Sequence, residues 1–111
     1  MLEKALAGKV KTWAKARGIF YRRIENLAGE GDPDVYMGIR GKHVWVELKT
    51  GTTLRVSQIN WMHIARRSGV PFIALRMNNK GECKLLDELG LQGEYPTLDS
   101  ALSHVWDKWL S

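Results

Sequence analysis

Three side chains near the middle of the chain have the types and the spacing that phosphodiester hydrolysis requires. Asp34 follows Pro33, and a Glu-x-Lys sequence, Glu47 to Lys49, begins after twelve intervening residues. Oxygen donors such as carboxylates and carbonyls are the ligands that Mg²⁺ takes, and the ion keeps several of its waters. A bound cation lowers the pKa of such a water and neutralises charge that develops on the phosphate. We therefore expect Asp34, Glu47 and the Leu48 carbonyl to bind Mg²⁺ or Mn²⁺. Lys49 is expected to orient the attacking water and to stabilise the same charge.

A β-hairpin is predicted to bring these residues together. Residues 34–40 and 43–49 both alternate between apolar and polar side chains, which is the pattern of half-buried strands. Gly41-Lys42 lies between them and is the expected two-residue turn, because Gly adopts the positive φ that such a turn requires.

The expected register of this hairpin sets the geometry of the acidic pair. Met37 faces Val46 in it, so that the aliphatic side chains share one face. Asp34 faces Lys49 and lies diagonal to Glu47, with Cβ separations of roughly 5–8 Å. A shift by one residue would mix apolar and charged side chains on both faces. Two carboxylates and an ammonium group are therefore expected at one end of the hairpin.

Each half of this pattern also has an ordinary structural explanation. Asp-Pro-Asp is typical of turns, and Glu-x-Lys in a strand is typical of a solvated sheet face. Their combination in this register favours the functional interpretation.

The other predicted elements surround this hairpin and give an α/β fold, a mixed sheet flanked by helices. The third and fourth strands are expected to be joined by a right-handed crossover. These elements are a helix over 2–17 stopped by Gly18, a strand over 19–24, a helix from an N-cap at Ser57 to Ser68 stopped by Gly69, strands over 72–77 and 82–86, and a helix over 98–110.

Length and composition limit the class of protein. A chain of 111 residues suits one domain over residues 1–111, and no apolar stretch reaches the roughly 20 residues of a membrane helix. The single cysteine, Cys83, fits a reducing cytoplasm. The net charge of +5 suits a polyanionic partner. Residues 1–23 hold seven Lys or Arg against Glu3 alone, whereas residues 82–111 hold six acidic residues against two basic ones.

The sequence resembles a known family at these residues. Gly31 to Asp34 followed by Glu47 to Lys49 is similar to the signature of PD-(D/E)xK nucleases. Within that superfamily, residues 3–77 most resemble the small VRR-NUC domains common in phages, relatives of archaeal Holliday junction resolvases. The resemblance implies a restriction-endonuclease-like domain with an αβββαβ core plus a C-terminal helix. It also implies the cytoplasm of a bacterial or phage-infected cell.

The resemblance adds two residues to the expected site. A first-helix glutamate often joins the metal site in such nucleases, and Glu3 occupies that place; its alternative role is to complement the helix dipole. Gln58 matches the glutamine that follows the Glu-x-Lys strand and is expected to bond near the scissile phosphate. Its alternative is an ordinary polar residue in the first turn of a helix.

Several residues outside this motif are candidates for contacts with other molecules. Arg22, Arg23 and Arg55 flank the site in sequence and suit phosphate contacts, with a solvated surface as the alternative. Trp106 and Trp109 can either cover the core of their own chain or anchor a subunit interface.

We expect a divalent-metal-dependent DNA endonuclease that acts on branched DNA, including Holliday junctions. Because symmetric cutting of two strands needs two active sites, we also expect a homodimer. Two alternatives stay open at this point. One is a DNA-binding protein with a nuclease-like fold and no hydrolysis, and the other is a repair- or restriction-type nuclease that acts on linear duplex.

Overall fold

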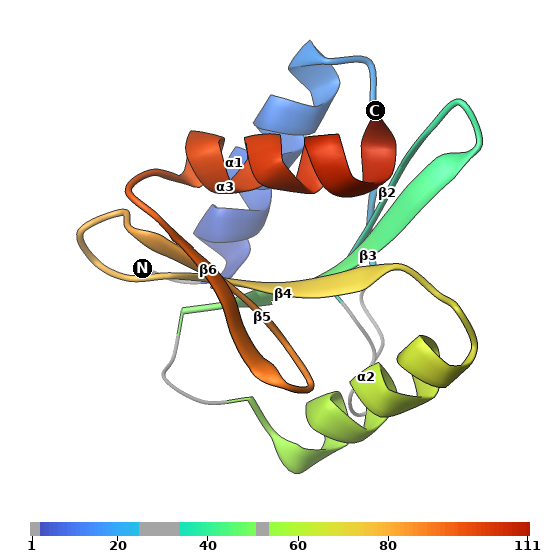
Figure 1. Cartoon of the computed structure of the whole chain (residues 1–111). Helices are drawn as coiled ribbons and strands as arrows, with labels where there is room; N and C mark the ends of the chain where they lie inside the picture. The colour runs from blue at the N-terminus through green and yellow to red at the C-terminus, as the bar shows by residue number, and fades with distance from the viewer. Residues whose placement is uncertain (1–2, 25–33, 51–53) are drawn as a thin grey trace.

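The computed structural model describes residues 3–24, 34–50 and 54–111, and six strands of this part of the chain form one sheet. Three helices and a π-helical segment pack on it (Figure 1). The elements are α1 (Glu3–Ala16), β1 (Phe20–Arg23), β2 (Val35–Ile39), β3 (Lys42–Lys49), α2 (Val56–Arg67), β4 (Phe72–Met77), β5 (Cys83–Asp87), β6 (Gly90–Tyr95), α3 (Leu98–Val105) and the π-helix Trp106–Leu110.

The strands lie in the sheet in chain order, from β1 to β6. Every neighbouring pair is antiparallel except β3 and β4, which are parallel and joined through α2. A parallel pair needs such a long connection, because the chain must return to the end of the sheet where the first strand began. The predicted mixed sheet with flanking helices is confirmed. The strand β6, Gly90–Tyr95, was not predicted from the sequence.

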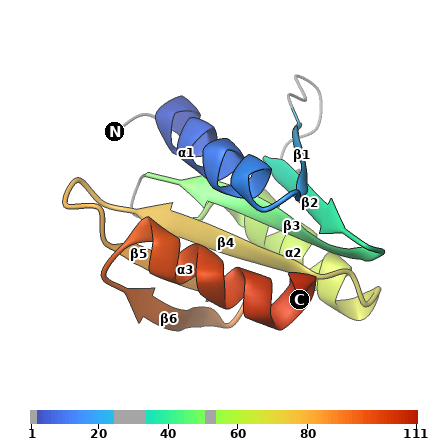
Figure 2. The ribbon, with the colours of Figure 1, turned by 90° about the horizontal axis from the view of Figure 1, so that it is seen from above.

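The helices cover the two faces of the sheet unequally. Figure 2 shows α1 and α3 together on one face, with α2 behind the sheet on the other. The larger core lies under α1 and α3, and the smaller one lies between α2 and the middle of the sheet. The larger core includes Leu6, Val10, Met37, Val46, Leu48, Leu75, Leu85 and Leu102, and the smaller includes Met62, Ala65, Phe72 and Ala74.

The turn of the β2–β3 hairpin differs from the predicted one. Arg40 and Gly41, not Gly41 and Lys42, are the two turn residues, and both have positive φ, 52° and 80°. Two positive φ values in succession are typical of a type I′ turn, in which Gly favours the second position rather than the first. The turn therefore lies one residue earlier than expected.

The earlier turn shifts the register of the hairpin by two residues. Val35 faces Val46, where the sequence predicted that Met37 would do so. Side chains alternate with period two, so a shift of two keeps every side chain on its predicted face. Continued by one residue, this register sets Asp34 across from Glu47, and the predicted pairing of Asp34 with Lys49 is wrong.

Two helix ends also differ from the prediction. The helix α2 is capped by Arg55 rather than Ser57, and the side chain of Gln58 accepts a hydrogen bond from the Arg55 N–H at 2.7 Å. This bond occupies one of the N–H groups that a helix start leaves without a helical partner. Gly69, with φ of 72°, follows the helix as predicted. The last helix continues beyond Val105 as a π-helix instead of a regular α-helix.

Trp106 and Trp109 pack against the larger core of their own chain. Of the two roles considered for them, the structure shows the contact with the core. No helix among the described residues is long and apolar enough to span a membrane.

Candidate active site

The predicted site residues meet at one end of the sheet, where β2 begins and β3 ends. Asp34 directly precedes β2, and Glu47 and Lys49 are at the end of β3. Gln58 lies in the first turn of α2 and Glu3 in the first turn of α1. Residues 31–33, the rest of the aspartate motif, lie outside the described residues.

Asp34 is held by the backbone on two sides. Its Oδ2 accepts a hydrogen bond from the Leu48 N–H at 2.8 Å, and its carbonyl accepts one from the Ile24 N–H at 2.7 Å. The first bond ties the carboxylate to the residue between Glu47 and Lys49. The two halves of the motif are therefore connected by a direct contact as well as by the sheet.

Glu47 is a buried carboxyl group, 6% exposed, on the sheet face that α2 covers. Its Oε1 accepts a hydrogen bond from Gln58 Nε2 at 2.8 Å. The Gln58 amide is itself 2% exposed, and its oxygen accepts from the Arg55 N–H. Gln58 thus connects the N-terminus of α2 to Glu47 through both ends of one side-chain amide. This contact was not predicted, although the sequence did place Gln58 at the site.

The electrostatics of Glu47 favour its protonated form. Its pKa is raised from 4.5 to about 9, first by burial and then by hydrogen bonding to Asp34 and by the charge of Asp34. Lys49 opposes this effect, and the charge of Glu3 adds to it. Burial and a nearby carboxylate both disfavour the ionised form. Burial and the Asp34 carboxylate thus favour the protonated form of Glu47, and a bound cation would favour its ionised form.

Glu3 reaches this end of the sheet from α1, on the opposite face. Its Oε1 lies 3.9 Å from the Nζ of Lys49, and the Glu3 side chain is 44% exposed. The structure therefore places the Glu3 carboxylate beside the Lys49 ammonium group rather than in direct contact with the carboxylates of Asp34 and Glu47.

The residues that the structure describes include no group of three or more His, Cys, Asp or Glu side chains placed to hold a metal ion. Mg²⁺ does not need such a group, because it is commonly held by one or two carboxylates and completes its shell with water and substrate oxygens. The bonds from the Leu48 N–H and the Gln58 amide use Oδ2 of Asp34 and Oε1 of Glu47, in addition to the hydrogen bond between the two carboxyl groups. The donor set therefore fits a hard divalent cation.

The three predicted arginine contacts lie on the elements around the site. Arg22 and Arg23 are the last two residues of β1, and they pair with the start of β2. Arg22 is exposed and Arg23 half-buried. Arg55 is the exposed N-cap of α2.

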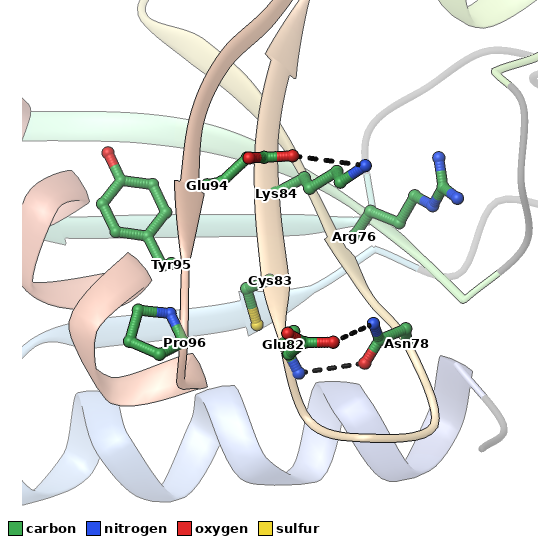
Figure 3. A pocket seen from close by; sticks show the side chains of 8 residues that line it. All are labelled: Arg76, Asn78, Glu82, Cys83, Lys84, Glu94, Tyr95 and Pro96. Atoms are coloured by element: carbon green, nitrogen blue, oxygen red, sulfur yellow. Dashed lines mark hydrogen bonds and ion pairs between the residues drawn. The ribbon is translucent and has the colours of Figure 1, made fainter.

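Arg76 is a basic residue near the site that the sequence did not single out. It lies directly beside Lys49, as its partner in the parallel β3–β4 pair. One feature of the sequence could have pointed to Arg76: it is the single charged residue in the otherwise apolar strand from Phe72 to Met77. Arg76 also borders a hollow over β4, β5 and β6 (Figure 3). That hollow contains none of the predicted site residues and is lined by Arg76, Asn78, Glu82, Cys83, Lys84, Glu94, Tyr95 and Pro96.

Comparison with known proteins supports the resemblance at the level of the fold. No protein-family model matches the sequence, and no curated protein does either. Among solved structures, the chain is similar to the Holliday junction resolvase Hjc of the archaeal hyperthermophile Archaeoglobus fulgidus. The TM-score is 0.62 at 12% identity, covering 90% of this chain and 98% of the resolvase. It is also similar to a VRR_NUC domain, with a TM-score of 0.50 at 25% identity, covering 61% of this chain and 81% of that domain. The predicted fold, a small α/β domain of the restriction-endonuclease-like kind, is therefore confirmed, as is the resemblance to a VRR_NUC domain and to an archaeal Holliday junction resolvase.

Proposed function

We propose that this protein is a divalent-metal-dependent DNA endonuclease that cuts branched DNA. The observation that carries the proposal is the meeting of Asp34 and Glu47 at one end of the sheet, with Lys49 beside them. The structural neighbours support the same class, because one is a Holliday junction resolvase and the other a VRR_NUC domain.

Asp34, Glu47 and the Leu48 carbonyl would hold Mg²⁺ or Mn²⁺, using the carboxylate oxygens that Leu48 and Gln58 do not occupy. Such an ion supplies a water of lowered pKa and neutralises charge on the phosphate. Gln58 keeps Glu47 in place through its amide, and the backbone N–H of Leu48 does the same for Asp34. Side chains that are held in advance lose little free energy of reorganisation when substrate binds.

Lys49 is the cationic member of the site. Its side chain is 15% exposed, so its charge acts in a partly desolvated position, where electrostatic stabilisation is stronger than in water. We assign to it the orientation of the attacking water and the stabilisation of the phosphate oxygens. Glu3, within ion-pair distance of Lys49, would position this ammonium group and reach the metal through water.

The test compares cleavage of a four-way junction, a flap and a plain duplex of matched sequence, with Mg²⁺, Mn²⁺ or EDTA. We expect wild-type protein to cut the branched substrates with either metal and not in EDTA. Asp34→Asn, Glu47→Gln and Lys49→Ala should each lower the cleavage rate at least 100-fold while the junction is still bound, since each removes a group acting on the reacting atoms.

Three outcomes would contradict this assignment. Full activity of Asp34→Asn or of the wild type in EDTA would exclude the site. Junction binding without product under every metal would favour a non-catalytic DNA-binding protein. Equal cleavage of the plain duplex would favour a nuclease of linear DNA.

A further inference from the structure

A row of basic residues crosses the sheet beside the candidate active site. Lys49 on β3 faces Arg76 on β4, and Arg76 faces Lys84 on β5. Lys49 is distant in sequence from the other two, which lie on the two strands of one hairpin. The parallel pairing of β3 with β4, and the antiparallel pairing of β4 with β5, place them next to one another.

The three side chains belong to the same face of the sheet as Glu47. Directly paired residues of neighbouring strands project to the same side. The residues on either side of Arg76, Leu75 and Met77, are buried in the core under α1 and α3. Arg76 therefore projects from the opposite face, and Figure 3 shows Arg76 and Lys84 extending to the same side of the sheet.

The dimensions of this row suit a nucleic-acid backbone. Neighbouring strands lie about 4.8 Å apart, so the row from Lys49 to Lys84 spans roughly 10 Å. One DNA strand carries a phosphate about every 3.4 Å along the helix axis. The row therefore extends over an axial length of about three phosphates, and its first member, Lys49, is already at the proposed site of hydrolysis.

The acidic partner of Lys84 is weakly held. Lys84 Nζ lies 3.5 Å from Glu94 Oε1, and these side chains are 46% and 63% exposed. Such solvent-exposed pairs contribute between about 0 and 1 kcal/mol. A phosphate, which binds several cations at once, can replace Glu94 at little cost.

We propose that Lys49, Arg76 and Lys84 form a phosphate-binding row that holds the DNA strand on the β4–β5 side of the active site. This inference rests on the proposed function, because it takes the scissile phosphate to lie at Asp34, Glu47 and Lys49. Arg76 and Lys84 bind phosphates next to the scissile one, and Arg76 can do so bidentately. They increase affinity without sequence preference, since phosphate contacts do not distinguish bases.

The test measures the affinity of a four-way DNA junction in EDTA, where hydrolysis does not interfere, over a series of salt concentrations. Each lost phosphate contact lowers the slope of log affinity against log salt by about 0.9. We expect Arg76→Gln and Lys84→Gln to lower the slope by about 1 each, and the double variant by about 2. Glu94→Gln should instead tighten binding, because it frees Lys84 and removes a negative charge near the phosphates.

The matched control is Lys15→Gln/Lys108→Gln, which removes the same net charge from exposed positions on α1 and on the C-terminal π-helix. A double variant that binds like this control would exclude the row. With Mg²⁺, the Arg76 and Lys84 variants should cleave the junction with a raised KM, whereas the control variant should keep the wild-type KM.

This experiment separates the two proposals. If the wild-type protein cleaves the junction and the row variants bind DNA as the wild type does, the phosphate-binding proposal is wrong and the nuclease proposal stands. If the row variants show reduced salt slopes but the wild-type protein cleaves no substrate, the nuclease proposal is wrong and the row is a DNA-binding surface. Circular dichroism of each variant, with the exposed Lys84→Gln as the least disruptive change, shows that the fold is intact.

Discussion

Glu47 combines a buried position with a second carboxylate, Asp34, as its near neighbour. Burial alone would raise the pKa of a carboxyl group, and the neighbouring charge raises it further. The Gln58 amide satisfies one oxygen of this group, which lowers the cost of burying it. A cation bound between Asp34 and Glu47 would stabilise this arrangement, because it would offset the repulsion between the two carboxylates.

The pKa of Glu47 predicts how the stability of the metal-free protein changes with pH. The folded state keeps a proton on this group up to about pH 9, whereas the unfolded chain loses it near its ordinary value of 4.5. The folded state thus binds more protons between these values, so the free energy of unfolding falls as pH rises. We expect urea unfolding in EDTA to show this fall between about pH 5 and about pH 8.

Glu47→Gln should remove most of this dependence, because glutamine does not titrate. Asp107→Asn, at an exposed position of the C-terminal π-helix, is the control and should keep the wild-type pH profile. The same slope in Glu47→Gln as in the wild type would show that another group is responsible.

At the scale of the element, the hairpin of β2 and β3 sets the positions of both carboxylates. Its faces follow from the alternation of apolar and polar residues, and its register follows from the turn. Arg40 and Gly41 both adopt positive φ, which Gly tolerates and Arg does not favour. In the register that this turn gives, Val35, Met37, Val44 and Val46 are buried on one face.

This turn supplies a prediction about stability. Arg40→Asn creates an Asn-Gly turn, the combination best suited to a type I′ hairpin, and should stabilise the protein by about 0.5–1 kcal/mol. Gly41→Ala, at φ of 80°, should destabilise it by about 1–2 kcal/mol. Thermal and urea unfolding measure both changes. A stability loss in Arg40→Asn would mean that the exposed arginine makes contacts that outweigh its backbone cost.

At the scale of the whole molecule, the charges are divided between the two ends of the chain and the faces of the sheet. The proposed site and the basic row lie on the α2 side of the sheet, whereas α3 and the following π-helix pack on the other side. Leu102, Val105 and Leu110 are buried there. These two elements therefore contribute to folding, away from the surface that we assign to DNA.

The proposed cutting of a DNA junction leads to a prediction about assembly. We expect a homodimer, with a mass twice the 12.6 kDa of one chain, because two strands require two active sites. Light scattering coupled to size exclusion measures the mass of the protein alone and of its junction complex. Mixed dimers of wild type and Asp34→Asn should nick one strand only. A single 12.6 kDa chain in the junction complex would contradict the prediction.

The sequence determined the parts of this protein that depend on local patterns. Alternation in residues 34–49 defined two strands and their faces, and the spacing of Asp34, Glu47 and Lys49 placed these side chains at one hairpin end, as the structure shows. Such features depend on backbone periodicity and on the hydrophobic effect within a few residues, so they can be read along the chain.

The tertiary structure decided what depends on contacts between distant segments. The bond from Gln58 to Glu47 and the approach of Glu3 to Lys49 both required the packing of helices on the sheet. The parallel pairing of β3 with β4 brought Arg76 beside Lys49. None of these contacts has a local signal, because the free energy that selects them comes from burying surfaces that only the folded chain brings together.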